Sequence, residues 1–364
     1  MQVDMHYYGT LAIALAAGIQ KDDAEIIAYA SQFVDDSTGD DSKVNDDHGL
    51  LYAINTAQSP RQVIIDNPFR LQEITIEQRR VWIPFHYLPG GEGTSFSEKL
   101  LCIKNGIIAQ KMFEHNIETA LRKPFGLHLL GITAHVYMDT FSHYGFSGIS
   151  STLNRIRNNT IELNEDQKIN GLLPRLGVAR VAENIVKGLG HVGVIELPDI
   201  PYLKWQFKFD RPRSNDDDKN IRNNSVDFME GCKCLYYYFL KFAKLRYAKF
   251  GNRWKFASSG IKLKNTKSGK HQNFSKIKNK IQEIIESEND NKDDRIEKWY
   301  ASGLIQDCKR YDNDTWEQEK ENFSKRLSSS DGIHTNVYRF HQAATFHRYY
   351  VLKDLLPSYG IAVY

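Results

Sequence analysis

The segment Gly126–Phe146, GLHLLGITAHVYMDTFSHYGF, sets His135, Asp139 and His143 four residues apart inside an apolar run that favours a helix. A helix turns about 100° per residue, so steps of four drift only about 40° and the three side chains share one face. The two histidines then lie about 12 Å apart along the axis, too far to bind one ion through Zn–N bonds of about 2.1 Å. We therefore interpret the stripe as part of a site for two ions, with Asp139 between them. Three ordinary polar residues on a partly buried helix are the plainer alternative.

The whole sequence predicts an all-α fold. The chain has 364 residues, of which 41% are hydrophobic and 26% charged, and this is enough for one large core. We expect a multi-helix bundle with the metal cluster in a central cleft and a small irregular or β-hairpin insert near residues 40–93. The helical core is predicted to comprise residues 1–250 together with 331–364. Residues 251–330 are expected to form a polar insertion, basic and then acidic, that contributes little to the core.

The expected helices follow from apolar residues at helical spacing between glycine and proline breaks. They are Tyr8–Ala17, Asp22–Val34, 95–122, a motif helix ending near Tyr144, Val178–Leu189, Val226–Phe250, Ile277–Ser287, Trp316–Leu327 and Asn336–Leu356. Two runs of the insert, Gln62–Ile65 and Val81–Phe85, are instead rich in β-favouring residues.

Charge is distributed unevenly although the net charge is only +3. Residues Gly251–Lys280 contain nine Lys or Arg and no Asp or Glu. This basic block is a candidate contact for nucleic acid or an anionic surface, and a solvated basic loop is the plainer alternative.

Cysteine usage and hydropathy predict a cytoplasmic protein. Four cysteines do not make a disulfide framework, and a reducing interior suits them. The apolar run Leu11–Ile19 is too short to span a bilayer, and no Lys or Arg precedes it as in a signal peptide.

Further metal-ligand residue types occur at four other places in the chain. They are Asp4, His6, Asp35, Asp36, His86, His191 and Asp199. Each lies where a predicted helix begins, ends or meets a loop, and such positions can converge in the cleft of a bundle. Asp4 also suits a helix cap, and the Asp35–Asp36 pair also suits a solvated acidic turn. A His and Asp set of this size exceeds what one ion needs, which favours ligation.

The order of these residues resembles the zinc-dependent phospholipase C and single-strand-specific nuclease superfamily. An early His is followed by an Asp after a helix, a His, HxxxDxxxH on a helix, and a later His with a carboxylate. The resemblance covers about residues 1–205 and the C-terminal helix. It implies an all-helical enzyme that holds three zinc ions and cleaves phosphodiesters. The segments HYYGT, ASQFVDD, FHYLPG and GHVGVIELPD also resemble a bacterial family of unassigned function.

The resemblance implies that Asp139 bridges two ions, with His135 on one and His143 on the other. Asp35 or Asp36 would join His135 on the first ion.

His86 is implied as a further ligand of the first ion, in competition with His48. We prefer His86 because a proline and two glycines fix its loop. His191 is implied for the second ion, together with a carboxylate at an unusual spacing. Glu196 follows His191 by five residues and Asp199 by eight, and Asp199 is assigned.

His6 is implied as a ligand of the third ion. In the superfamily, the amino group of an N-terminal tryptophan is also a ligand, whereas residue 1 here is methionine. Either Asp4 substitutes for that amino group or the third ion is absent.

We expect a zinc-dependent phosphodiester hydrolase that uses a metal-activated water and holds two or three ions. Nucleic acid or nucleotides are the favoured substrates, because the chain is expected to be intracellular and carries the basic block. Phospholipase C-like cleavage of phospholipid headgroups and a non-catalytic, metal-stabilised binding or effector protein are the alternatives. No GxSxG, GxxxxGK[ST] or HExxH motif occurs, so a side-chain nucleophile is not indicated. Asp35 or Asp36 is the candidate acceptor of the water proton if it is not a ligand.

Overall fold

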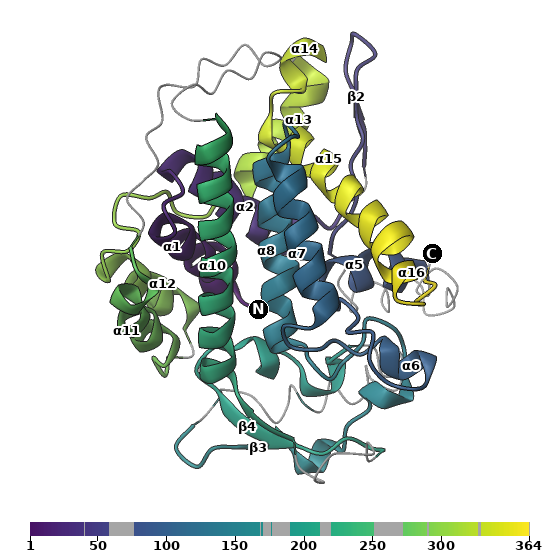
Figure 1. The fold of residues 1–364 in the computed structure, drawn as a ribbon, viewed down its shortest axis with the longest axis vertical. Helices are drawn as coiled ribbons and strands as arrows, with labels where there is room; N and C mark the ends of the chain where they lie inside the picture. The colour runs from purple at the N-terminus through teal and green to yellow at the C-terminus, as the bar shows by residue number, and fades with distance from the viewer. Residues whose placement is uncertain are drawn as a thin grey trace.

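The computed structural model describes residues 1–39, 41–57, 76–167, 169, 176, 190–211, 220–250, 272–289, 291–326 and 329–363. Within these ranges the chain is mostly helical, which confirms the predicted all-α class (Figure 1). Three of the predicted features, Gln62–Ile65, the helix Val178–Leu189 and residues 251–271 of the basic block, lie outside the described residues.

Helix α8 (Gly126–Ser142) forms the centre of the molecule. All of its residues except Leu127 are buried, as expected of a helix that is apolar nearly all round. It packs against α2 (Lys21–Asp36), α7 (Ile107–Ala120), α10 (Asn224–Phe250) and α15 (Asn336–Tyr349) (Figure 1). The chain leaves the helix through His143 and turns at Gly145, which has a φ of 81°. The motif helix and the docking of the C-terminal helix are therefore as predicted.

The crossing of α8 and α2 depends on Gly131. A Cβ atom at this position would collide with the carbonyl oxygen of Ile27 and with the Cβ of Ala30. Only glycine allows the two backbones to approach this closely. The close approach brings the end of α2, where Asp35 lies, beside the motif face of α8.

The N-terminal segment forms a π-helical turn, η1 (Asp4–Gly9), that continues into α1 (Thr10–Ala16). Gly18, with a φ of 87°, separates it from α2. Asp22 and Asp23 occupy the first turn of α2, where the helix dipole favours negative charge. The chain start marked in Figure 1 lies in the interior, near α10 and α8.

The polar stretch before the last helix contributes more to the core than its composition predicts. It forms α11 (Phe274–Ile285), α12 (Lys292–Ala301) and α13 (Asp314–Arg326). Phe274, Ile281, Trp299 and Trp316 are buried in the main hydrophobic core. The expected small contribution is therefore wrong, because a few large side chains on one face of each helix suffice for docking.

Within the described residues, the β strands form two small antiparallel sheets. Strands β1 (Lys43–Val44) and β2 (Leu50–Leu51) form a hairpin in the predicted insert. The second sheet has the order β3 (Glu162–Leu163), β4 (Lys204–Phe207) and β5 (Asn220–Asn223), and it covers a separate aromatic cluster that includes Phe146 and Trp205.

Residues Val81–Phe85 are helical despite their β-favouring composition, because burial against the bundle overrides local propensity. They lie in η2 (Gln78–Trp82) and α5 (Ile83–Phe85). The remaining short elements outside the centre are α6 (Phe96–Lys99), η3 (Thr152–Asn154), η4 (Asn158–Thr160), α14 (Ser329–Gly332), η7 (Tyr350–Leu355) and α16 (Leu356–Ser358).

The four cysteines are free thiols. Among the residues that the structure describes, no helix is both long enough and apolar enough to cross a membrane.

Candidate metal centre

The motif face of α8 forms the base of a buried His and Asp cluster. The Oδ2 atom of Asp139 lies 3.2 Å from Nε2 of His135 and 3.6 Å from Nδ1 of His143. His143 is the residue that follows the last turn of α8. Asp139 therefore lies between the two histidines, as the spacing of the motif predicts.

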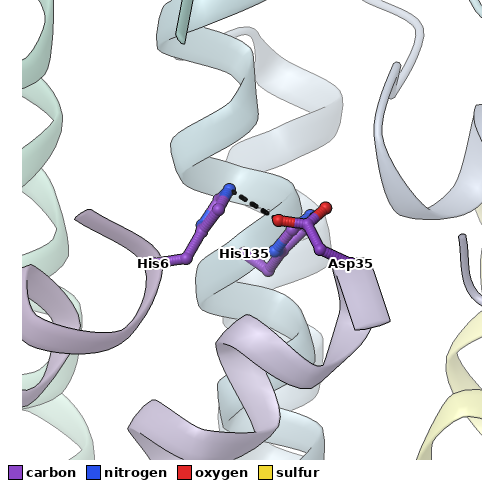
Figure 2. Close-up of side chains that lie close together, drawn as sticks. All are labelled: His6, Asp35 and His135. Atoms are coloured by element: carbon purple, nitrogen blue, oxygen red, sulfur yellow. Dashed lines mark ion pairs between the residues drawn. The ribbon is translucent and has the colours of Figure 1, made fainter. Parts of the chain in front are cut away.

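Three other elements bring ligand-type side chains to the His135 side of Asp139. Asp35 comes from the last turn of α2, His86 directly follows α5, and His6 comes from η1. Figure 2 shows the Asp35 carboxylate beside the rings of His6 and His135, which are stacked with their centres 3.8 Å apart. The carboxylate oxygens of Asp35 lie 3.9 Å from Nε2 of His6, 3.7 Å from Nε2 of His135 and 3.8 Å from Nδ1 of His86.

The other side of Asp139 is completed by a loop of two 3-10 turns, η5 (Val192–Val194) and η6 (Leu197–Asp199). Nε2 of His143 lies 3.1 Å from Oδ1 of Asp199, and Nε2 of His191 lies 3.4 Å from Oδ2 of Asp199. The late carboxylate beside His191 is thus Asp199.

Backbone carbonyls fix the orientation of four of the five rings. Carbonyl oxygens only accept hydrogen bonds, so the ring nitrogen facing each of them carries the proton. These donors are His86 Nε2 to Thr56, His135 Nδ1 to Ser31 and His143 Nδ1 to His86, each over 2.8 Å, and His191 Nδ1 to Ile195 over 2.5 Å. When such a ring is neutral, its second nitrogen presents its lone pair to the cluster, which is how outer partners orient metal-binding histidines.

This arrangement leaves acceptor atoms facing one another. Nδ1 of His86 lies 3.3 Å from Nε2 of His135, and both lie within 3.4 Å of Asp139 Oδ2. No hydrogen-bond donor among the described residues reaches Asp139 Oδ2. Two lone pairs and a carboxylate oxygen at such distances repel one another unless a cation lies between them. The donor set therefore fits a metal ion.

The described residues contain three overlapping groups of this kind. They are His6, Asp35 and His135; His86, His135 and Asp139; and His143, His191 and Asp199. Within each group the ligand atoms lie within 4.8 Å of one another. These groups could hold metal ions, and their mixture of imidazole and carboxylate is a donor set that suits zinc.

The protonation states of His6, His191, Asp139 and Asp199 also suit metal binding. Burial lowers the pKa of His6 to about 3 and that of His191 to about 4, so both rings are neutral near pH 7. Burial alone would raise the pKa of Asp139, but the Met1 amino group and the neighbouring histidines outweigh burial and hold that pKa well below its usual value. Asp199 is held ionised in the same way. Neutral histidines and ionised carboxylates are the forms that bind metal.

The amino group of Met1 lies inside the cluster. It is fully buried, donates a hydrogen bond to Asp139 Oδ1 over 2.9 Å, and lies 3.1 Å from Asp199 Oδ1. Burial lowers the pKa of this amine, but the nearby carboxylates raise the pKa by more than burial lowers it, to about 11. The protonated amine thus supplies positive charge between carboxylates where a metal cation would also be stabilised. Composition and periodicity gave no signal for this contact.

Two of the predicted ligands lie outside the cluster. The Asp4 carboxylate pairs with Arg295 over 2.7 Å, so it does not take the place of an N-terminal amino group. The Asp36 carboxylate accepts hydrogen bonds from the Tyr311 hydroxyl and from Gln32. Successive helical residues point about 100° apart, so only one of the adjacent Asp pair faces α8, and that one is Asp35. Of the two competing histidines, His86 and not His48 belongs to the cluster.

The fold and the cluster define a mostly helical protein with buried His and Asp groups that could bind metal. The chain belongs to the family of unknown function DUF6765, whose model matches residues 1–355. Comparisons with curated proteins and with solved structures found no match.

Proposed function

We propose that this protein is a zinc-dependent phosphodiester hydrolase that acts on nucleic acid or nucleotides. The observation that carries the proposal is the meeting of His86 Nδ1, His135 Nε2 and Asp139 Oδ2, three atoms that can only accept when both rings are neutral. Such a site is costly to bury without a cation.

Asp139 has the central role in this proposal. Its two oxygens face different partners, with Oδ2 toward His86 and His135 and Oδ1 toward His6 and the Met1 amine. A carboxylate placed in this way can hold two ions. Paired ions of this kind activate water and neutralise the charge that develops on a phosphate ester during hydrolysis.

The exposed edge of the cluster indicates where a substrate would approach. The side chain of His135 is fully buried, whereas that of Asp35 is 31% exposed and that of His86 is 13% exposed. Asp35 is therefore the most exposed of the cluster carboxylates, since the Asp199 side chain is 16% exposed and that of Asp139 is 1% exposed. We assign it the acceptance of a proton from the attacking water, in addition to any contact with metal.

The choice of phosphodiesters is supported by the resemblance to the zinc-dependent phospholipase C and nuclease superfamily. The structure supports this choice because His135, Asp139 and His143 share one face of α8, and the other residues named by the resemblance, except Asp4 and Asp36, meet them there. Nucleic acid is preferred to phospholipid because of the basic block, of which residues 272–280 are described and include part of the amphipathic helix α11.

The test combines metal analysis with hydrolysis assays on the untagged full chain. Elemental analysis should find two or three zinc ions per chain, and Asp139→Asn should lose most of this metal. Loaded wild type should cleave single-stranded DNA or RNA, or bis(p-nitrophenyl) phosphate, whereas Asp139→Asn should not. If only phosphatidylcholine vesicles were cleaved, the substrate class would be phospholipids and not nucleic acid or nucleotides. Stoichiometric metal without turnover on any of these would indicate a structural metal centre and contradict the hydrolase proposal.

A further inference from the structure

The N-terminal segment is held in the centre by a residue that is distant in the sequence, 291 positions after Asp4. Arg295 belongs to α12 and is only 1% exposed. Its Nε donates to Oδ2 of Asp4 over 2.7 Å, and its Nη2 donates to Oε1 of Gln2. Gln2 and Asp4 lie in the sequence between two residues of the cluster. These are Met1, whose amine reaches Asp139, and His6, whose ring faces Asp35.

The rest of the guanidinium is also fixed. Nη1 donates to the carbonyl oxygen of Asn289 over 2.5 Å, and the guanidinium carbon lies 6.0 Å from the centre of the Tyr202 ring. Helix α12 packs directly on η1. The rigid fork of an arginine can therefore set the position of two N-terminal residues relative to a helix, which a flexible lysine does less well.

We propose that Arg295 is a positioning residue of the metal centre: through Gln2 and Asp4 it places the Met1 amine and the His6 ring against Asp139. The inference rests on the proposed metal centre and assigns a role in it to the segment 272–326. Arg295 itself touches none of the cluster atoms. Its effect passes through the backbone of residues 1–6, as an outer partner acts on a ligand.

A purely structural role is the competing explanation. Buried ion pairs often contribute little net stability and serve instead to fix one arrangement. The two roles differ in what they predict, because a structural pair changes stability alone, whereas a positioning pair also changes the environment of the Met1 amine and the affinity for one ion.

The test uses a paired substitution that leaves no buried charge alone. The variant Asp4→Asn with Arg295→Met removes both charges at once, since loss of only one would leave the other unpaired in the core. The matched control is Asp23→Asn with Arg246→Met, which removes a less deeply buried ion pair, 2.8 Å long, between α2 and α10. Thermal unfolding of both variants gives the stability change against which the other readouts are compared.

The first readout is the reactivity of the Met1 amine in chelator-treated protein. The protein is exposed to an acylating reagent, and the N-terminal peptide is quantified by mass spectrometry. We expect slow labelling in wild type and in the control pair, and labelling at least about tenfold faster in the Asp4/Arg295 pair. This measurement does not require metal, so it remains decisive if the wild type binds none and the proposed function fails.

The second readout is zinc affinity by chelator competition. In the Asp4/Arg295 double variant, the affinity for one zinc ion should fall by about 10–100-fold, the usual effect of losing an outer partner. The remaining zinc should bind as in wild type. Equal labelling rates and equal zinc affinities in both variant pairs would overturn the proposal and leave Arg295 a structural residue.

Discussion

The ring of His135 donates its Nδ1 proton to the carbonyl oxygen of Ser31 over 2.8 Å, which ties the centre of α8 to the middle of α2. Ser31 lies one turn before Asp35 on α2, just as His135 lies one turn before Asp139 on α8. The bond therefore orients an imidazole and sets the register of the two helices at the same time. The geometry of the candidate metal centre depends on this helix crossing.

Gly131→Ala should disturb that crossing. The added methyl group meets the backbone of α2, which cannot move aside without shifting Ser31, and we expect a loss of about 1–3 kcal/mol in unfolding free energy. Zinc affinity should fall as well. Gly231→Ala is the matched control, because its methyl group meets side-chain atoms of Met138 and Phe141 rather than backbone. Denaturant unfolding and zinc titration of both variants give the comparison. Equal stability losses would contradict the role of the close crossing.

The adjacent carboxylates Asp35 and Asp36 provide an internal comparison. Asp35→Asn should weaken zinc binding and abolish hydrolysis, because this carboxylate faces His6, His86 and His135. Asp36→Asn should retain zinc and lose about 1–3 kcal/mol of stability, since it weakens the hydrogen bond from Tyr311. Metal content and thermal unfolding distinguish the two. The reverse pattern would show that the wrong residue of the pair has been placed in the centre.

An extension before Met1 should interfere with the centre. The Met1 amine is buried against Asp139 and Asp199, and a peptide bond in its place carries no charge to pair with these carboxylates. We expect a Gly-Ser pair at this position to lower both the zinc content and the melting temperature. The same pair added after Tyr364 serves as the control. Full zinc content with the N-terminal extension would contradict the placement of the amine.

His341 should make the stability of the chelator-treated protein sensitive to acid. Burial, with Lys320 nearby, lowers the pKa of this histidine to about 3, and its Nδ1 accepts a hydrogen bond from the Ile54 amide. In the unfolded chain it protonates near pH 6.5, so the unfolded state binds the extra proton and stability falls as the pH drops from about 6.5 toward 3.

His341→Gln can still accept from Ile54 but does not titrate. The unfolding free energy of wild type should fall relative to that of His341→Gln by up to about 2 kcal/mol between pH 6.5 and 5. Denaturant titrations at several pH values test this expectation. Parallel pH profiles for the two proteins would contradict it.

The sequence alone predicts those parts of the centre that depend on the helical repeat of 3.6 residues per turn. The HxxxDxxxH stripe and the helices around it come directly from apolar spacing, and the structure places His135, Asp139 and His143 as that spacing predicts. Asp35 could not be separated from Asp36 by pattern, because the rotation of α2 about its axis depends on its packing against Gly131.

Other features lack a local signal. Helix α12 is so polar that only Ile296 and Trp299 indicate a buried face, and Arg295 resembles one more surface charge until α12 is docked on the N-terminal segment. Residues Val81–Phe85 show the opposite case, in which tertiary packing imposes a helix on a β-favouring run and so delivers His86 to the cluster.

The pairing of Arg295 with Asp4 joins residues 291 positions apart, and this separation has a consequence for biosynthesis. Contacts between distant parts of a chain form late, because the entropy of closing the loop is lost before the contact stabilises it. A growing chain emerges N-terminus first, so His6 and Met1 leave the ribosome long before α12 exists. The centre can therefore mature only after most of the chain has been translated, and a truncated product would expose its histidines without completing the site.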